Sequence, residues 1–505
     1  MKRPLKLATV AALSAFLLAG GAPAPLASTA SAKSHLGGLL WPMFGRNQGR
    51  TFNGPTSLTP ASAQTLTRRW FVSANLAVTA TPTVAHGTVF AGSWDGRFRA
   101  IDLATGNLRW TFKVKSQPAI RPDPNAPGGP QNAKSDGGII TSTAIYVRET
   151  SAHPPLVIFG GGYTLYALRA GTGRVFWEHD YTGNPSKPPN PKNDRTRIFT
   201  SPAVVGNHVF FGNTNDGQPG YHSYFASASL RTGKPQWEFQ TDVTRRGRIV
   251  NNGCDGVWGS PAVDRRHGLV FFDTADCDST DSMPFAERVI ALHSRNGRLA
   301  WVFKPPRKDP GCDWDFGATP NFRSRTASSP AFLGVGGKDG TYYSVSPTTG
   351  KLRWRRNVVA GGNSGGFIGT AALDGSHVYG ATAIGELPAP PCDPSNPNDT
   401  QVQEPSMHAF DARTGALLWE QEQSQSVSAT TVAGGMTFVC TAFSQQLQIR
   451  NVADGSPVVI IPLAGGCNSG VVVAGNMVII GEGEAENSSN SGVELFTPNG
   501  DPPRA

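Results

Sequence analysis

The sequence lacks any apolar run long enough to cross a lipid bilayer. Its 505 residues include the apolar stretch "ATVAALSAFLL" near the beginning, which is too short for a membrane helix. The basic segment "MKRPLK" precedes this stretch and the small-residue pattern Ala30-Ser31-Ala32 follows it, which is the order of a secretory signal. No cysteine follows "LLAGGA", so a lipid anchor is not indicated. We therefore expect residues 1–32 to be a cleavable signal peptide, a mature chain from Lys33, and a secreted protein without a membrane span.

Cysteine is scarce, and its spacing argues against two kinds of site. No C-x-x-C pair occurs, which disfavours structural zinc, and no C-x-x-C-H occurs, which disfavours covalent c-type haem. An even number of cysteines in an exported chain favours disulfides. We expect Cys440 to pair with Cys467, and two of Cys254, Cys277 and Cys312 to pair with each other, although six cysteines allow other arrangements. The six are Cys254, Cys277, Cys312, Cys392, Cys440 and Cys467.

The chain also lacks a dense block of lysine or arginine. Its formal net charge is +9, and Lys2, Arg3 and Lys6 of the expected signal peptide contribute to it. The other basic residues are dispersed, which is typical of a soluble protein and not of a nucleic-acid-binding surface. Helical periodicity is nearly absent as well. We expect a monomer that does not bind nucleic acid.

A strand-turn-strand pattern repeats along the chain. The first copy is "AIDLATGNLRW", and six copies place a tryptophan four residues after the turn glycine. Glycine supplies the positive φ that such a turn requires. A start motif such as "TATP" or "FTSP", followed by a Val- or Phe-rich run, precedes each copy. The eight copies are marked by Trp110, Trp177, Trp237, Trp301, Trp354, Trp419, Gly455 and Gly500.

Four short strands per unit, repeated eight times, predict an all-β, eight-bladed β-propeller. Radial closure protects the strand edges that a lone four-stranded sheet would expose. The last copy has no tryptophan, but "TLTRRW" supplies Trp70 ahead of the first start motif. We therefore expect an N-terminal arm, residues 33–75, to provide the outermost strand of the eighth blade. Residues 33–505 would then form one domain, with seven tryptophans packed between the blades.

The long irregular insertions are expected on one face of this ring. In an antiparallel blade, the turn between the third and fourth strands lies on one face, and the connections between the second and third strands and between blades lie on the other. Long loops on a compact fold are usually functional, so we place the site on the loop-rich face, around the central channel. The insertions are residues 116–138, 183–197, 213–223, 276–285, 304–318 and 386–407.

Four side chains in these connections could carry chemistry. Trp258 precedes a start motif and is out of register with the repeated tryptophans, so it could be a platform for a flat aromatic ligand. Asp276 ends the run "GLVFFDTAD", Asp315 belongs to "DWDF", and Lys338 lies in "GGKDG". Aspartate and lysine also occur in ordinary turns, which is the structural alternative for these three residues.

The repeats resemble those of the pyrroloquinoline-quinone (PQQ) propeller enzymes. The opening arm "WPMFGRNQGRTFNGPTSLTP" and four internal segments are similar to the polyvinyl-alcohol dehydrogenase branch of these enzymes. The resemblance implies an oxidoreductase that uses PQQ and Ca²⁺ to oxidise an alcohol, secondary or polymeric, and passes electrons to a separate acceptor. The four segments are "GVWGSPAVDRRHGLVFFDTAD", "DWDFGATP", "GGKDGTYYSVSPTTGKLRW" and "AGGNSGGFIGTAA".

The resemblance also implies a role for each candidate residue. Trp258 would underlie the quinone, and Lys338 would contact the quinone oxygens. Asp276 would help to bind Ca²⁺, which prefers oxygen ligands and polarises the quinone carbonyl. Asp315 would be the general base that removes the alcohol proton as hydride or its equivalent leaves the carbinol carbon, with Asp313 as loop scaffolding.

Two departures from the family pattern concern the cofactor. The third-blade loop, "NTNDGQPGYHSYF", offers Asp216 as a metal ligand where the family has a glutamate, and no two cysteines are adjacent. Without a second anionic ligand, Ca²⁺ would bind more weakly. The alternative is therefore a propeller without cofactor, related to the scaffold propellers of outer-membrane assembly, that binds a protein or a glycan on its loop-rich face.

Overall fold

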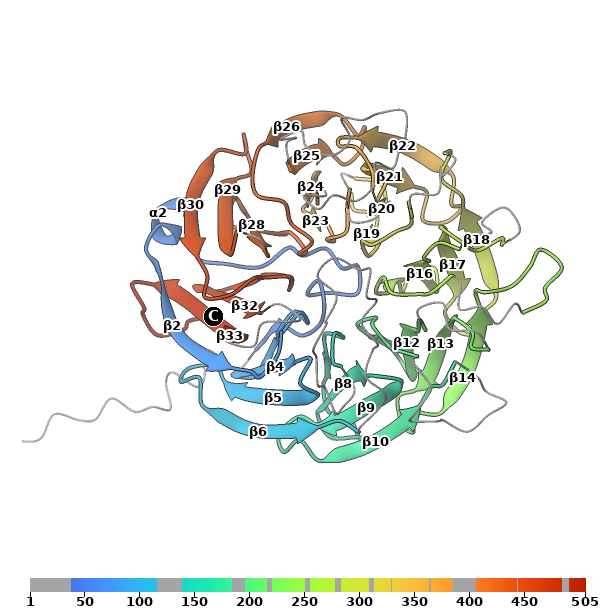
Figure 1. The fold of residues 1–505 in the computed structure, drawn as a ribbon, viewed down its shortest axis with the longest axis horizontal. Helices are drawn as coiled ribbons and strands as arrows, with labels where there is room; N and C mark the ends of the chain where they lie inside the picture. The colour runs from blue at the N-terminus through green and yellow to red at the C-terminus, as the bar shows by residue number, and fades with distance from the viewer. Residues whose placement is uncertain are drawn as a thin grey trace, which may run out of the picture.

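The computed structural model shows a ring of antiparallel β-sheets around a central axis (Figure 1). It confirms the predicted all-β, eight-bladed propeller, and its described part contains one short helix, α2 (Pro60–Ala63). The predicted signal peptide lies outside the described residues. These are residues 38–115, 139–183, 196–215, 220–249, 255–277, 283–307, 313–327, 329–362, 365–383, 406–442, 444–483 and 490–505.

Each blade has four strands that follow one another in the chain, apart from the eighth, and β1 (Leu39–Trp41) adds a fifth strand to the sheet of the first blade. Blades one to four contain β3 (Thr83–Ala85), β4 (Thr88–Gly92), β5 (Arg97–Asp102) and β6 (Leu108–Lys113); β7 (Ile145–Val147), β8 (Leu156–Gly161), β9 (Thr164–Arg169) and β10 (Val175–Asp180); β11 (Ala203–Val205), β12 (His208–Gly212), β13 (Tyr224–Ser229) and β14 (Pro235–Gln240); and β15 (Ala262–Asp264), β16 (Leu269–Asp273), β17 (Val289–His293) and β18 (Leu299–Phe303).

The remaining blades repeat this order. They contain β19 (Asn321–Arg323), β20 (Phe332–Gly336), β21 (Thr341–Val345) and β22 (Leu352–Asn357); β23 (Ala372–Leu373), β24 (His377–Ala381), β25 (Met407–Asp411) and β26 (Leu417–Gln421); β27 (Thr431–Ala433), β28 (Met436–Thr441), β29 (Gln446–Asn451) and β30 (Pro457–Pro462); and β31 (Val472–Ala474), β32 (Met477–Glu482), β33 (Gly492–Pro498) and β2 (Leu66–Ser73).

The two ends of the chain close the ring through β2. This strand pairs antiparallel with β33, with Arg68 opposite Phe496 and Phe71 opposite Glu494. The blue β2 therefore lies beside the red β33 in Figure 1. This confirms the prediction that the N-terminal arm provides the outermost strand of the eighth blade.

In every blade except the seventh, which has no repeated tryptophan, the tryptophan packs on the repeated glycine of the next blade. The indole of Trp301 lies against Gly350, whose φ is +67°, and its Nε1 donates to Pro347 O at 2.9 Å. Trp70 makes the same contact with Gly106 across the closure and donates to Leu103 O at 3.1 Å. A turn glycine is thus required both for its positive φ and for the space that the indole fills. This interlock explains why the two residues recur together.

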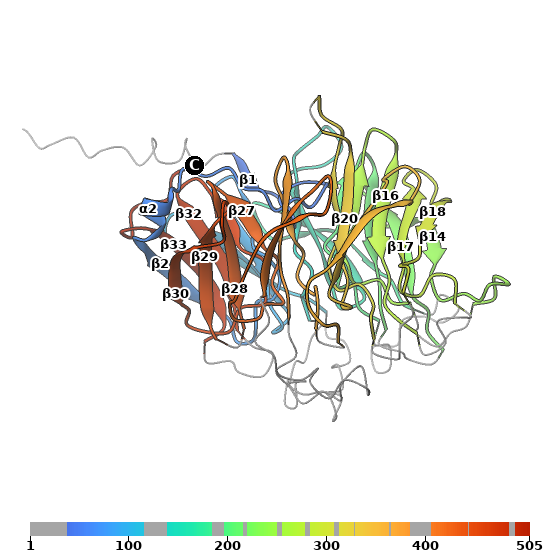
Figure 2. The ribbon, with the colours of Figure 1, turned by 90° about the horizontal axis from the view of Figure 1, so that it is seen from above.

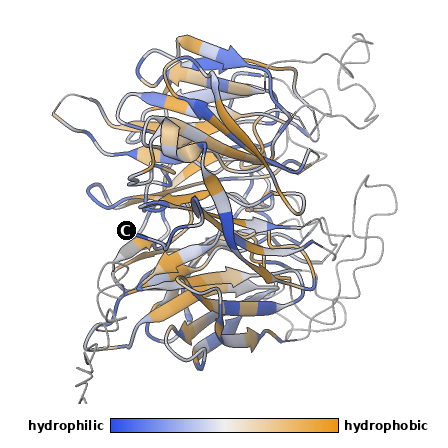
Figure 3. Ribbon diagram, turned by 90° about the vertical axis from the view of Figure 1, so that its left-hand side faces the viewer, coloured by the Kyte–Doolittle hydropathy of each residue, from blue (hydrophilic) through white to orange (hydrophobic). Residues whose placement is uncertain are grey.

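Apolar burial differs between the inner and outer strands of a blade. Second strands such as β8 and β32 are buried along their whole length, whereas outermost strands such as β6 and β22 are largely exposed. Hydrophobic residues recur along strands throughout the ring (Figure 3). The core is therefore divided into layers between neighbouring blades, because each sheet packs face to face with the next.

The N-terminal arm passes around the inside of the ring. Its strand β1 (Leu39–Trp41) pairs with β3, and β1 and α2 lie on the same face in the side view of Figure 2. The arm then bonds to later blades in chain order, so it lines the end of the channel opposite the predicted site. The backbone bonds are Tyr146 N to Pro42 O (2.7 Å), Val263 N to Gln48 O (2.8 Å), Phe322 N to Gly49 O (2.7 Å), Leu373 N to Thr51 O (2.8 Å), Val432 N to Phe52 O (2.9 Å) and Ser57 N to Gly475 O (2.9 Å).

The described cysteines are all oxidised. Cys440 and Cys467 form the predicted disulfide, which joins β28 to the segment before β31. Cys277 is also disulfide-bonded, and Cys254 and Cys312, its two predicted alternatives, lie outside the described residues. None of the helices in the described ranges has the length and apolar character needed to traverse a membrane.

Candidate functional site

The structure brings four of the predicted site residues together at blades four and five. Trp258 lies in the connection before β15, and Asp276 lies between β16 and β17. Asp315 lies in the connection before β19, and Lys338 joins β20 to β21. Connections of these two kinds leave an antiparallel blade at the same end, so the side chains share one face. Asp216, the fifth predicted residue, lies outside the described residues.

A buried ammonium group occupies the centre of this cluster. Lys338 Nζ lies 2.8 Å from Asp315 Oδ1 and 2.8 Å from Asp313 Oδ2. Lys338 is 6% exposed and Asp315 is 2% exposed. The backbone supports the same pairing, because Lys338 N donates to Asp315 O at 3.0 Å. The lysine therefore links the "GGKDG" turn to both aspartates of "DWDF".

Trp258 forms one wall of the cluster. Lys338 Nζ lies 5.1 Å from the centroid of its ring, which is within the range of a cation–π contact. The indole also reaches the fifth blade, since a Cβ at Gly317 would lie 3.3 Å from Trp258 Cη2. The half-buried tryptophan thus presents a planar surface next to the ammonium group.

Three carboxylates at the site could hold a metal ion together. One oxygen each from Asp276, Asp313 and Asp315 lies within 4.8 Å of the others. Such a set of oxygen atoms suits Ca²⁺. The interpretation of Asp313 as loop scaffolding is incomplete, because its carboxylate contacts Lys338 and belongs to this set. Its backbone has a positive φ of 55°, which turns the side chain towards the cluster without any signal in the sequence pattern.

The pKa values of Asp315 and Lys338 are both shifted upward, for different reasons. Burial raises the pKa of Asp315, and the neighbouring ammonium of Lys338 opposes this shift. Burial alone would lower the pKa of Lys338, but the charges of Asp315 and Asp313 outweigh it. The lysine therefore remains an ammonium ion, and the basicity of Asp315 is increased by its surroundings.

Asp273 is a buried carboxyl group that the sequence analysis did not single out. It ends β16 and is fully buried, and its oxygens accept no hydrogen bond from any described residue. A Cβ at Gly259 would lie 1.9 Å from Asp273 Oδ1, so this carboxyl packs directly against the residue after Trp258. Burial, and then the charge of Asp315, hold the pKa of Asp273 well above its usual range. The residue appears in the sequence only as the polar end of a strand.

A second ion-pair network fixes the turn that carries Lys338. Arg307 Nε lies 2.9 Å from Asp339 Oδ2, and Arg307 Nη1 lies 3.0 Å from Glu287 Oε2. Arg307 also bonds the carbonyl of Trp314, between the two aspartates of "DWDF". Tyr343 donates its hydroxyl to Asp339 Oδ2 at 2.5 Å. These buried contacts hold both site segments in place.

Comparison with known proteins identifies the family. A family model named PQQ, which describes the β-propeller domain of glucose, ethanol and alcohol dehydrogenases, matches residues 41–360. The chain belongs to this family. A second family model, for the outer membrane protein assembly factor BamB, matches residues 338–458. The resemblance to PQQ propeller enzymes is therefore confirmed.

Individual relatives of this PQQ-family chain are distant. It is 22% identical to a polyvinylalcohol dehydrogenase of Pseudomonas sp over 359 residues, which is 65% of this chain and 52% of that protein. The chain thus spans about half the length of the curated relatives it matches. A quinohemoprotein alcohol dehydrogenase from Comamonas testosteroni superposes with a TM-score of 0.68 at 17% identity, over 92% of this chain and 81% of that one. BamB from Moraxella catarrhalis gives a TM-score of 0.54 at 14% identity, over 86% and 99%.

Proposed function

We propose that this protein is an exported PQQ- and Ca²⁺-dependent dehydrogenase that oxidises an alcohol. The observation that carries the proposal is the pairing of Lys338 with Asp315 against the ring of Trp258. A planar aromatic surface, a cation and a buried carboxylate lie within one cluster, and they come from the segments that resemble polyvinyl-alcohol dehydrogenases.

The residues present are compatible with a quinone cofactor and its metal ion. Trp258 would support the flat ring system, and Lys338 would donate hydrogen bonds to quinone oxygens. Asp276 and Asp313 would supply anionic oxygen ligands to Ca²⁺. The third-blade loop contains Asp216 but no glutamate. Asp313 would supply an anionic ligand in place of that glutamate. When bound, PQQ accepts the electrons of the alcohol, and Ca²⁺ increases its electrophilicity.

Asp315 is the proposed general base. Its carboxylate would accept the hydroxyl proton of the alcohol as the hydride, or its equivalent, leaves the carbinol carbon. Its low exposure of 2% excludes bulk water, and burial raises its pKa towards the range of an effective base. Lys338 would keep this carboxylate oriented through the contact at 2.8 Å.

The substrate and the electron acceptor are inferred from the relatives. The polyvinyl-alcohol dehydrogenases suggest a secondary or polymeric alcohol. The dehydrogenase subunit of the alcohol dehydrogenase (quinone) of Komagataeibacter europaeus, another relative, suggests that electrons pass to a separate acceptor.

Reconstitution tests the proposal. The purified protein should bind PQQ in the presence of Ca²⁺, gain quinone absorbance, and reduce an artificial dye when an alcohol is added. The Lys338→Met variant, which lacks the cation beside Trp258, should lose quinone binding, while the exposed Lys351→Met variant should keep it. Equilibrium dialysis that detects no bound PQQ at micromolar concentration, with Ca²⁺ present, would refute the proposal.

The second candidate is a propeller without cofactor that binds a protein or a glycan. The match of residues 338–458 to the BamB model favours it. The same dialysis separates the two candidates, because a scaffold propeller would remain free of PQQ while staying folded by circular dichroism.

A further inference from the structure

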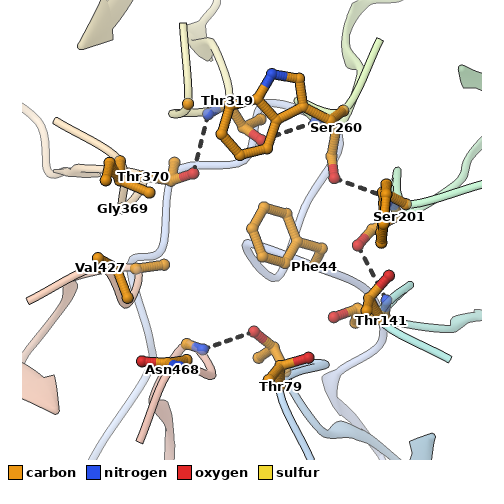
Figure 4. Close-up of a pocket in the computed structure, with 18 residues that line it drawn as sticks. Phe44, Thr79, Thr141, Ser201, Ser260, Thr319, Gly369, Thr370, Val427 and Asn468 are labelled. Atoms are coloured by element: carbon orange, nitrogen blue, oxygen red, sulfur yellow. Dashed lines mark hydrogen bonds between the residues drawn. The ribbon is translucent and has the colours of Figure 1, made fainter. Parts of the chain in front are cut away.

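A cavity on the propeller axis adjoins the site described above. Its volume is about 140 Å³, and the start motifs of all eight blades line it together with Phe44 of the N-terminal arm (Figure 4). Trp258 lines this cavity and also contacts Lys338, whereas Asp276, Asp313 and Asp315 do not line it. The cavity is therefore separate from the acidic cluster.

Hydroxyl groups from successive blades form a belt around this cavity. Each hydroxyl of the belt accepts a backbone N–H from the preceding blade, as the dashed lines of Figure 4 show. The pairs are Thr143 N to Ser201 Oγ (3.0 Å), Ser201 N to Ser260 Oγ (2.9 Å), Ser260 N to Thr319 Oγ1 (2.8 Å), Thr319 N to Thr370 Oγ1 (3.1 Å) and Gly470 N to Thr81 Oγ1 (2.9 Å).

The protons of these hydroxyls are available to an occupant of the cavity. Within the described part of the chain, each of the five belt hydroxyls accepts a hydrogen bond and none of them donates one to a protein atom. Thr79 behaves in the same way, accepting Trp94 Nε1 at 2.8 Å. Thr141 and Thr143 also line the cavity, and their hydroxyls have no hydrogen bond to a described protein atom. The wall therefore presents O–H donors to an occupant that accepts hydrogen bonds.

A buried positive charge lies next to the cavity on the side of the N-terminal arm. Arg50, which is fully buried, donates to Ser201 O at 3.1 Å, to Pro202 O at 3.0 Å and to Pro261 O at 2.7 Å. It also donates to the carbonyl of Phe44 at 2.7 Å. Two of these acceptors belong to cavity-lining residues, and no described carboxylate forms an ion pair with the guanidinium. A buried charge is ordinarily compensated by a partner of opposite sign.

We propose that the axial cavity is a binding site for a small inorganic anion of the halide class. The belt of O–H donors would coordinate the anion, and Arg50 would supply the compensating positive charge. A cation is disfavoured because no carboxylate lines the cavity. The volume admits one halide with several waters, since water occupies about 30 Å³ in the liquid. The inference does not depend on quinone binding.

Bromide is a suitable probe because its anomalous scattering identifies it in a crystal. Crystals of the wild-type protein soaked in sodium bromide should show an anomalous peak on the propeller axis, between Phe44 and Trp258. In solution, the melting temperature should rise with sodium bromide relative to sodium gluconate at equal ionic strength, because a ligand that binds only the folded state stabilises it.

Substitution of two cavity-lining threonines provides the matched control. The double variant Thr141→Val and Thr143→Val removes two O–H donors that have no described hydrogen bond to the protein, so it should fold and lose the peak and the bromide-specific shift. The double variant Thr141→Ser and Thr143→Ser keeps the donors and should retain both. If the bromide-soaked wild-type crystal shows only water on the propeller axis and no anomalous peak, the proposal is overturned. A bromide peak of equal height in the valine variant would identify an adventitious ion only and would overturn it as well.

Discussion

Lys338 Nζ and Asp315 Oδ1 lie 2.8 Å apart in a pair of side chains that are almost inaccessible to solvent. Asp313 gives the same ammonium a second carboxylate partner at 2.8 Å. The cluster thus concentrates one positive and two negative charges in a region of low dielectric constant. Its stability depends on the cation, because without Lys338 the carboxylate of Asp315 would be buried without compensation.

Replacing Lys338 with methionine should therefore destabilise the protein in a pH-dependent way. Removal of one partner from a buried ion pair typically costs about 3–5 kcal/mol. The carboxylate left behind can be protonated at low pH, so the loss in free energy of unfolding should be larger near about pH 8 than near about pH 5. Urea titrations at the two pH values measure this difference. The exposed Lys351→Met variant should show little change at either pH, and equal losses at both pH values for Lys338→Met would contradict the expectation.

Asp315→Asn should abolish alcohol oxidation without preventing cofactor binding. The amide is nearly isosteric but cannot accept the alcohol proton, and the loss of a general base typically costs about 100- to 10,000-fold in rate. Dye-reduction kinetics of the reconstituted protein measure the change in kcat, and quinone absorbance measures the bound cofactor. The exposed turn residue Asp454 provides the control through Asp454→Asn. Full activity of Asp315→Asn would show that another group removes the proton.

The repeated glycine and tryptophan made the fold predictable from the sequence. Each pair encodes both a local turn and a contact with the next blade, so their spacing specifies the number of blades as well as the strands. The position of Trp70 ahead of the first start motif allowed ring closure by β2 to be predicted. The path of residues 42–57 around the channel could not be predicted, because the arm has no strand periodicity and is held by bonds to distant blades.

The candidate site could be predicted only in part. Trp258 was recognised because it breaks the register of the repeat, and Lys338 because it lies in a connection on the expected face. Asp313 was interpreted only as loop scaffolding and Asp273 was not singled out, because their roles arise from three-dimensional surroundings. A positive φ turns Asp313 towards Lys338, and close packing against Gly259 buries Asp273. Neither feature leaves a trace in residue spacing.

The interlock between Trp301 and Gly350 should make Gly350→Ala strongly destabilising. The new Cβ would lie 2.5 Å from Trp301 Cε3 on a backbone with φ of +67°, so both steric overlap and backbone strain oppose it. Gly206 has a similar φ of +59°, but no atom lies within 4 Å of its notional Cβ. Gly206→Ala should therefore cost only about 1 kcal/mol, as expected for backbone strain alone. Thermal unfolding of the two variants measures the difference. Equal losses of stability would show that the indole of Trp301 moves to accommodate the new methyl group.

The facing carboxyl groups of Glu482 and Glu494 should make stability fall as pH rises. Both residues are buried, Glu482 Oε2 accepts Gly465 N at 2.9 Å, and Glu494 Oε1 bonds Arg68 Nε at 2.7 Å. Burial, and then the neighbouring Glu494, raise the pKa of Glu482 to about 10. In the unfolded chain this pKa is about 4.3, so between these values the folded state holds a proton that the unfolded state releases.

Glu482→Gln should remove this pH dependence, because the amide replaces the protonated carboxyl and does not titrate. Relative to the variant, the wild-type free energy of unfolding should fall with pH by up to about 1.4 kcal/mol per unit between about pH 5 and about pH 9. Urea denaturation across this range measures the slope. The exposed Glu149→Gln variant should follow the wild-type profile. Parallel profiles for wild type and Glu482→Gln would mean that Glu482 is ionised in the folded protein and that Arg68 compensates both carboxylates.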